Sequence, residues 1–120
     1  MSKRPISITI ISWLFIAMGV VSQFDTLSHW NMYRSSAAPV GNWIYGFLLM
    51  ELTRLLAIVA GVLMLKRNNF GRWLCIAWMA FHVLLSFGHA KSEVAMHAVI
   101  LVLLSYFLFR RPANEYFRGY

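Results

Sequence analysis

Two opposite charges stand close together in the middle of a long apolar stretch. Glu51 and Arg54 are the only charged residues within residues 43–65. A stretch of this length can span a bilayer as a helix, which leaves Arg54 about 16 Å from either end, too far for its side chain to reach water. Each charge costs about 2.5 to 3.5 kcal/mol near the centre of a membrane helix. Two explanations follow: an internal ion pair that specifies packing, or a site for an ion, a proton or an anionic headgroup.

The arginine argues against one form of the second explanation. A positive charge beside a carboxylate favours the ionised form of that carboxylate, whereas a proton-coupled glutamate must also become neutral. The pair Glu51 and Arg54 therefore disfavours a proton pump. It leaves open a site for another charged solute.

Two histidines in apolar segments, His82 and His97, form a second candidate group. They stand nine residues before and six residues after Lys91, at the centre of a short polar turn, so we expect them on adjacent helices. Paired imidazoles either hydrogen-bond between helices or ligate haem iron or a metal ion, for which Glu51 could be a further ligand. Because no glycine pattern marks a haem slot, we predict no cofactor, and haem or metal binding through His82 and His97 is the alternative.

The elements that must position these residues are four apolar segments, at residues 6–22, 43–65, 73–88 and 94–109. Hydrophobic residues make up 60% of the 120 residues, against about 45–50% in soluble domains. We therefore predict one all-α integral membrane domain over residues 1–120, folded as an up-down bundle of four transmembrane helices. Residues 23–42 form an outer loop and residues 110–120 an amphipathic tail on the inner membrane surface.

Counting along these helices gives each polar residue a depth. Glu51, His82 and His97 lie about 12, 9 and 5 Å below the outer surface, so we expect them to approach one another in the outer half of the bundle. Four further polar residues should stand above them at an outer mouth: Asp25, His29, His89 and Glu93. On the third helix, Trp78 and His82 fall on one face, which Ser86 continues.

The basic residues predict the orientation. The net charge is +7, and eight of the eleven Lys and Arg residues fall on one side of the predicted spans. Such an excess marks the cytoplasmic side, so both termini are predicted to be cytoplasmic. We interpret these residues as topology determinants that contact anionic lipid and predict no nucleic-acid binding. The first apolar segment is read as an uncleaved helix because no small-x-small cleavage site follows it.

Ala57 and Gly61 form a small-xxx-small pair in the second span. Such a pair lets another helix approach closely, either within the bundle or across a homodimer. The single cysteine, Cys75, excludes an intrachain disulfide. The chain contains no nucleophile elbow, P-loop, GxGxxG or HExxH sequence, so an enzyme would have to work through the histidines.

The C-terminal half resembles small bacterial inner-membrane proteins with four predicted spans, a class that implies no activity. The residues that carry this resemblance are Gly71-Arg72-Trp73, Phe81-His82-Val83, His89, His97-Ala98, Tyr106-Phe107-Leu108-Phe109-Arg110 and Tyr116-Phe117-Arg118-Gly119. The resemblance implies a location in the bacterial cytoplasmic membrane. The chain is also similar in length and span number to small multidrug transporters, but those carry a glutamate in the first helix and this chain does not. DoxX-type four-span proteins resemble it in architecture alone.

Three functions are therefore compatible with the sequence. The leading hypothesis is an accessory or interaction subunit in the membrane, alone, as a homodimer or in a larger complex, whose buried polar residues specify packing. The first alternative is a small dimeric transporter or channel that uses Glu51 and Arg54 for a charged solute. The second is a redox protein that binds haem or metal through His82 and His97.

Overall fold

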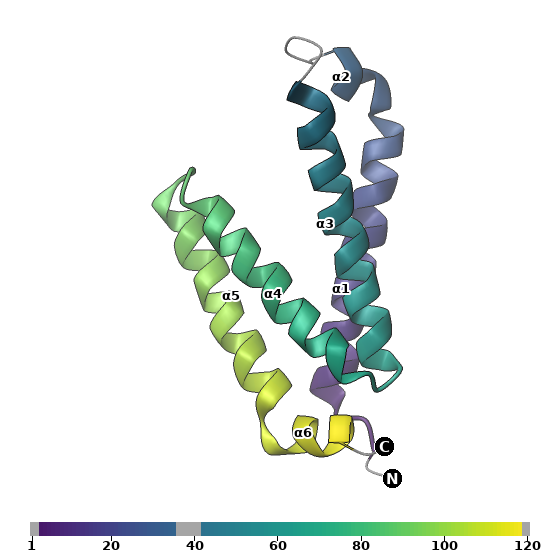
Figure 1. Ribbon diagram of the computed structural model, residues 1–120, viewed down its shortest axis with the longest axis vertical. Helices are drawn as coiled ribbons and strands as arrows, with labels where there is room; N and C mark the ends of the chain where they lie inside the picture. Colours follow the sequence, from purple (N-terminus) through teal and green to yellow (C-terminus); the bar gives the residue numbers. More distant parts are fainter. Residues whose placement is uncertain (1–2, 36–41, 119–120) are drawn as a thin grey trace.

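The computed structural model describes residues 3–35 and 42–118, and each element in these residues is an α-helix (Figure 1). The helices are α1 (Ile6–Ser28), α2 (Trp30–Ser35), α3 (Asn42–Leu65), α4 (Asn69–Ser86), α5 (Lys91–Phe109) and α6 (Arg111–Arg118). The prediction of an all-helical chain is confirmed for the described residues. Residues 36–41 of the predicted outer loop and residues 119–120 of the predicted tail lie outside them.

The first helix is longer than its apolar segment. We predicted a span over residues 6–22 and a loop over residues 23–42, but α1 continues to Ser28 and α2 occupies part of the loop. The hydroxyls of Thr26 and Ser28 donate to the carbonyls four residues earlier, at 3.1 and 2.9 Å, so polar residues at this end fit within the helix. Helix α1 therefore extends beyond the end of its apolar segment.

Three of the described helices are long and apolar enough to cross a membrane: Ile6–Ser28, Ile44–Leu65 and Lys91–Phe109. The fourth long helix, α4, is not in this group. Its first turn contains Asn69 and Arg72, which lower its apolarity. The structure thus supports a membrane protein with three span-length apolar helices, fewer than the four predicted spans.

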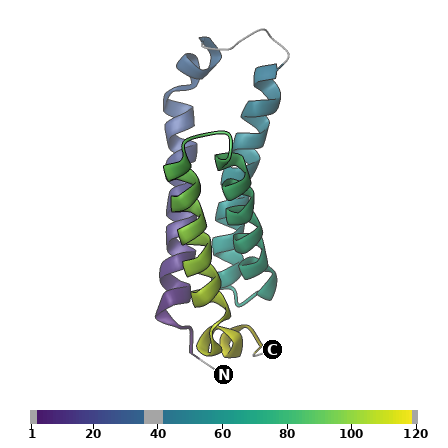
Figure 2. The same cartoon turned by 90° about the vertical axis from the view of Figure 1, so that its left-hand side faces the viewer.

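The long helices form two antiparallel hairpins. Helix α1 lies beside α3, and α4 lies beside α5 (Figures 1 and 2). The two hairpins converge at the end that holds both termini and diverge at the other end (Figure 1). The apolar core follows this shape, because its buried residues gather where the helices converge: Ile8, Ile11, Phe15, Ala57, Ala60, Met64, Cys75, Met79, Leu104, Leu108, Ala113, Tyr116 and Phe117.

Small residues bring α1 and α3 into close contact. A Cβ atom on Gly61 would lie 2.6 Å from the backbone oxygen of Ser12, and one on Gly19 would lie 2.4 Å from a side-chain carbon of Ile58. Ala57, on the same face of α3 as Gly61, is 1% exposed. The small-xxx-small pair therefore packs within the chain, which is the first of its two predicted uses.

The last helix packs into the protein. We predicted that residues 110–120 form an amphipathic tail on the inner membrane surface; α6 is amphipathic and buries its apolar residues Ala113, Tyr116 and Phe117 against the ends of the long helices. The hydroxyl of Tyr116 donates to the backbone oxygens of Met64 and Leu65, at 3.2 and 3.1 Å, and so joins α6 to the end of α3. Both carbonyls belong to the last turn of α3, where intrahelical donors run out, and that of Met64 also accepts the backbone N–H of Arg67 at 3.1 Å.

Arg72 anchors α6 from the other side. Its guanidinium donates to the side-chain oxygen of Asn114 at 2.6 Å and to the backbone oxygen of Leu108 at 3.3 Å. It also lies over the rings of Phe109 and Phe117, 4.6 and 5.1 Å from their centres. Only 8% of Arg72 is exposed, so these contacts hold α6 against the start of α4.

Replacing Arg72 with glutamine is expected to release α6. The substitution removes charge-assisted hydrogen bonds and ring contacts, which together are worth about 2 kcal/mol. Amide hydrogen exchange in α6 should then accelerate roughly 30-fold, as measured by mass spectrometry of the protein in detergent.

The matched control is Arg111→Gln in α6 itself. Arg111 is exposed and forms a surface ion pair with Glu115, at 2.9 Å, so its loss should change exchange less than about twofold. Equal acceleration in both variants would show that Arg72 is not the anchor.

Candidate functional site

Glu51 and Arg54 form an ion pair one helical turn apart on α3. The guanidinium Nη1 of Arg54 donates to Oε1 of Glu51 at 3.0 Å, and the two side chains are 17% exposed for Arg54 and 19% for Glu51. The i,i+3 spacing places both side chains on one face of the helix. The predicted pairing within one helix is therefore present in the structure.

Arg54 also joins α3 to α1. The same nitrogen donates to Oγ1 of Thr26, near the end of α1. Thr26 is only 2% exposed, and its own hydroxyl donates to the backbone oxygen of Ser22. Each of these three side chains thus has a polar partner inside the protein. Sequence reasoning missed Thr26 because it lies beyond the apolar part of the first segment.

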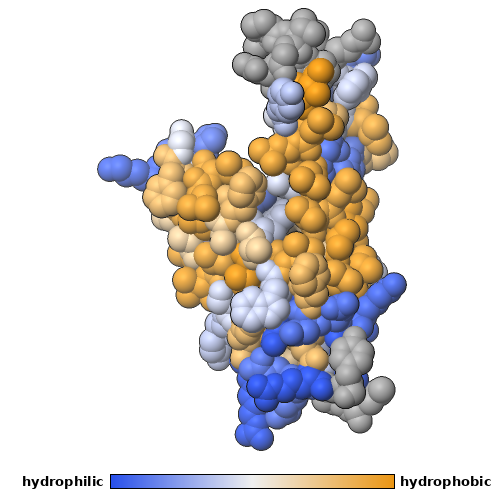
Figure 3. All heavy atoms as spheres, viewed as in Figure 1, coloured by the Kyte–Doolittle hydropathy of each residue, from blue (hydrophilic) through white to orange (hydrophobic). Residues whose placement is uncertain are grey.

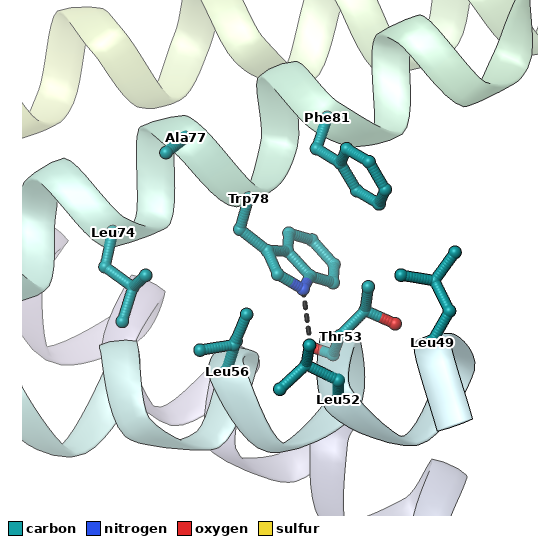
Figure 4. A pocket seen from close by; sticks show the side chains of 8 residues that line it. All are labelled: Leu49, Leu52, Thr53, Leu56, Leu74, Ala77, Trp78 and Phe81. Carbon is teal, nitrogen blue, oxygen red and sulfur yellow. Dashed lines mark hydrogen bonds between the residues drawn. The ribbon is translucent and has the colours of Figure 1, made fainter. Parts of the chain in front are cut away.

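Two surface grooves beside these helices are apolar. One of about 300 Å³ lies between α3 and α4 and is lined by Leu49, Leu52, Thr53, Leu56, Leu74, Ala77, Trp78 and Phe81 (Figure 4). Another, of about 280 Å³, lies between α1, α4 and α5. In the part of the chain that the structure describes, neither Glu51 nor Arg54 lines these grooves. Neither of these two grooves therefore gives a charged solute a path to Glu51 and Arg54.

Trp78 connects the two hairpins. Its indole nitrogen donates to the backbone oxygen of Thr53 at 2.6 Å, as the dashed line in Figure 4 shows. Its ring also packs edge-on against Phe15 of α1, with the ring centres 5.2 Å apart. Trp78 is therefore a packing residue at the junction of α1, α3 and α4.

His82 and His97 face each other across α4 and α5. Their ring centres are 6.2 Å apart, which confirms that they are neighbours on adjacent helices. They are joined through Ser86, whose Oγ donates to the backbone oxygen of His82 at 2.7 Å and lies 2.8 Å from Nδ1 of His97. The predicted interhelical hydrogen bond is present, with Ser86 as the intermediary that sequence reasoning did not assign.

The structure separates the two groups that we expected to find together. Glu51 and Arg54 turn toward α1, whereas His82 and His97 lie between α4 and α5. Within residues 3–35 and 42–118, no hydrogen bond or ion pair joins the two groups. Counting residues along a helix gives the depth of a side chain but not the helix that it faces. The single polar cluster that we expected is therefore two separate groups in the structure.

The four residues of the predicted outer mouth are likewise divided. Asp25, in the last turn of α1, and His29, which directly follows that helix, form an exposed pair with 3.1 Å between the carboxylate and the imidazole. His89 and Glu93 are exposed at the turn between α4 and α5, where Nδ1 of His89 lies 3.3 Å from the backbone oxygen of Leu85. No contact in the described part of the chain connects these two pairs into one mouth.

The cofactor alternatives can be weighed from the same contacts. A haem between His82 and His97 would have to separate α4 from α5, and the 2.8 Å contact of Ser86 with His97 closes that space. Glu51 does not join the histidines as a third metal ligand. Among the described residues, no three His, Cys, Asp or Glu side chains are grouped to hold a metal ion.

Comparisons with protein-family models, with curated proteins and with solved structures find no match to this chain, so its function has to be argued from its own residues.

Proposed function

We propose that the protein is an accessory or interaction subunit of the bacterial cytoplasmic membrane, in which the buried polar residues specify helix packing. The observation that carries this proposal is the internal network of Glu51, Arg54 and Thr26. Nη1 of Arg54 donates hydrogen bonds to the carboxylate of Glu51 on its own helix and to the hydroxyl of Thr26 on the neighbouring helix. A transported solute would have to compete with these two partners for Nη1 of Arg54.

Four crossings fit the arrangement best. Helix α4 lies antiparallel to the span-length helix α5, and its exposed residues from 73 onward are apolar: Trp73, Ala77, Leu84 and Leu85. Its 18 residues extend about 27 Å, close to the thickness of the hydrocarbon core. An amphipathic helix with a water-facing side would instead expose polar residues there.

The distribution of charge supports cytoplasmic termini. Hydrophilic residues gather at the end of the molecule that holds both termini, below a belt of hydrophobic residues (Figure 3). The helix bounds assign eight basic residues to this end: Lys3, Arg4, Lys66, Arg67, Arg72, Arg110, Arg111 and Arg118. By the positive-inside rule this end faces the cytoplasm and contacts anionic lipid. The resemblance to small four-span inner-membrane proteins agrees with this placement.

The proposal predicts that the charges themselves are dispensable for function. A deletion strain would be complemented with the wild-type protein, with the double variant Glu51→Leu/Arg54→Met, and with Glu51→Leu alone, at matched membrane levels. We expect the double variant to restore the wild-type phenotype, because two apolar side chains replace the pair without leaving a lone charge. A double variant that is folded but inactive would contradict the proposal.

Flux measurements test the rival transporter. Protein in proteoliposomes, wild type and Glu51→Gln, would be given gradients of protons, monovalent ions and small organic cations and anions. The accessory role predicts the same flux as in protein-free vesicles. A flux that the wild type supports and Glu51→Gln abolishes would establish transport instead.

A further inference from the structure

His82 and His97 have one nitrogen each that the packing does not use. Nδ1 of His82 lies 2.9 Å from the backbone oxygen of Trp78, and Nδ1 of His97 lies 2.8 Å from that of Glu93. A carbonyl oxygen only accepts hydrogen bonds, so Nδ1 carries the proton in both rings. In the neutral rings each Nε2 is then an unprotonated nitrogen with a free lone pair. Neither Nε2 has a hydrogen-bond partner among the described residues.

Both rings are held in place by further contacts. The indole of Trp78 packs on the ring of His82, with the ring centres 3.9 Å apart, and Ser86 contacts His97 at 2.8 Å. An imidazole that donates one N–H to a backbone carbonyl is oriented in the way that metal-ligating histidines are. The pair therefore presents two preoriented nitrogen ligands from two packed helices.

The distance between the two imidazole rings restricts the coordination geometry of an ion that both could bind. An imidazole nitrogen lies about 2 Å from a bound first-row metal, and its ring centre about 1.1 Å further, so two rings on one ion have centres at most about 6.2–6.3 Å apart. The observed 6.2 Å is at this limit, so an ion bound by both rings at this separation requires a nearly linear N–metal–N arrangement. Tetrahedral zinc would bring the ring centres to about 5 Å and would need further protein ligands or water.

We propose that Nε2 of His82 and Nε2 of His97 bind a monovalent d¹⁰ metal ion, Cu(I) or its analogue Ag(I), in two-coordinate linear geometry. Ions of this class accept two ligands, and imidazole is a suitable donor for copper. The absence of a third grouped ligand in the described residues fits this coordination number. The site goes beyond the proposed packing role, and it uses none of Glu51, Arg54 and Thr26.

The test is an anaerobic titration of the purified protein with Cu(I) in competition with a chromophoric Cu(I) chelator. We expect one ion per chain, and at least about 100-fold weaker binding in His82→Gln and in His97→Gln, because each variant removes one of two ligands. The matched control is His89→Gln, which removes an exposed histidine from the same hairpin and should bind as the wild type does. Wild-type affinity in His82→Gln or His97→Gln would overturn the site.

X-ray absorption of the wild-type Cu(I) protein provides a readout that does not depend on the folding of any variant. We expect two nitrogen ligands at about 2 Å with the outer-shell scattering of imidazole. A spectrum dominated by sulfur, or one with three or four ligands, would assign the copper to methionines or to another site and would contradict the proposal. A wild type that does not compete with the chelator would contradict it as well.

Discussion

Replacing Glu51 alone with leucine is expected to destabilise the protein by about 3 to 5 kcal/mol, because it leaves Arg54, whose side chain is only 17% exposed, without its counter-ion. Among the described residues, Arg54 would retain the hydroxyl of Thr26, a neutral acceptor. The double variant Glu51→Leu/Arg54→Met should recover most of this loss, to within about 1 kcal/mol of the wild type, since replacing both charges of a buried pair is often neutral. The effects of the two substitutions on the free energy of unfolding should therefore be strongly non-additive, as expected when Glu51 and Arg54 neutralise each other.

The measurement is a double-mutant cycle on the free energy of unfolding of protein in lipid bicelles. Leu52→Met is the matched control, because Leu52 neighbours Glu51 but is 53% exposed, and its replacement should cost less than about 0.5 kcal/mol. If the two single variants and the double variant all lie within 1 kcal/mol of the wild type, the pair does not specify packing.

The second large effect is expected at Gly61. A methyl group there would lie 2.6 Å from the backbone oxygen of Ser12 and 2.7 Å from a side-chain carbon of Ile16. Because a backbone oxygen cannot turn away as a side chain can, α1 and α3 must move apart. Gly61→Ala should therefore cost about 1 to 3 kcal/mol, although alanine favours a helix by about 0.5 to 1 kcal/mol over glycine.

Gly46→Ala in the same helix is the matched control. A Cβ atom on Gly46 would meet no atom within 4 Å, so the helical preference of alanine should act alone and leave the stability unchanged or raised by up to about 1 kcal/mol. Both variants would be compared by the same unfolding measurement. Equal effects at the two glycines would contradict the close packing of α1 on α3.

The parts of the fold that the sequence predicts are those with a strong periodic or compositional signal. The apolar segments give the long helices, the polar turn at Lys91 gives the adjacency of His82 and His97, and the small residues Ala57 and Gly61 give a close helix contact. Each of these follows from a local pattern and from short connections.

The parts that sequence reasoning missed depend on side chains far apart in the chain. Arg54 meets Thr26, 28 residues earlier, and Arg72 meets Asn114, 42 residues later. Each residue of these pairs fits its own helix without the other, so no local pattern marks the contact. The sequence could not predict the burial of Arg72 for a further reason. Its acceptors are a backbone carbonyl and an amide oxygen, and neither is an acidic residue that would suggest an ion pair.

The separation of the two polar groups has a similar cause. Depth along a helix follows from residue number, but the direction of a side chain depends on which helices pack on which face. The face of α3 that carries Arg54 and Ile58 packs on α1, as the close approach of Ile58 to Gly19 shows. His82 packs on Trp78 instead, and the histidines remain with the second hairpin.

Water access to the Glu51–Arg54–Thr26 network is the most direct test of whether these charges serve packing or transport. Thr26→Cys and Ser28→Cys, each in a Cys75→Ala background, would be reacted with a membrane-impermeant thiol reagent in sealed vesicles of both orientations. Ser28 is exposed two residues beyond the buried Thr26, so its cysteine reports reagent access to this end of α1. The packing role predicts that the cysteine at position 28 is labelled and the one at position 26 reacts only after unfolding in detergent. Labelling of both at the same rate would reveal an aqueous path to Arg54 and contradict it.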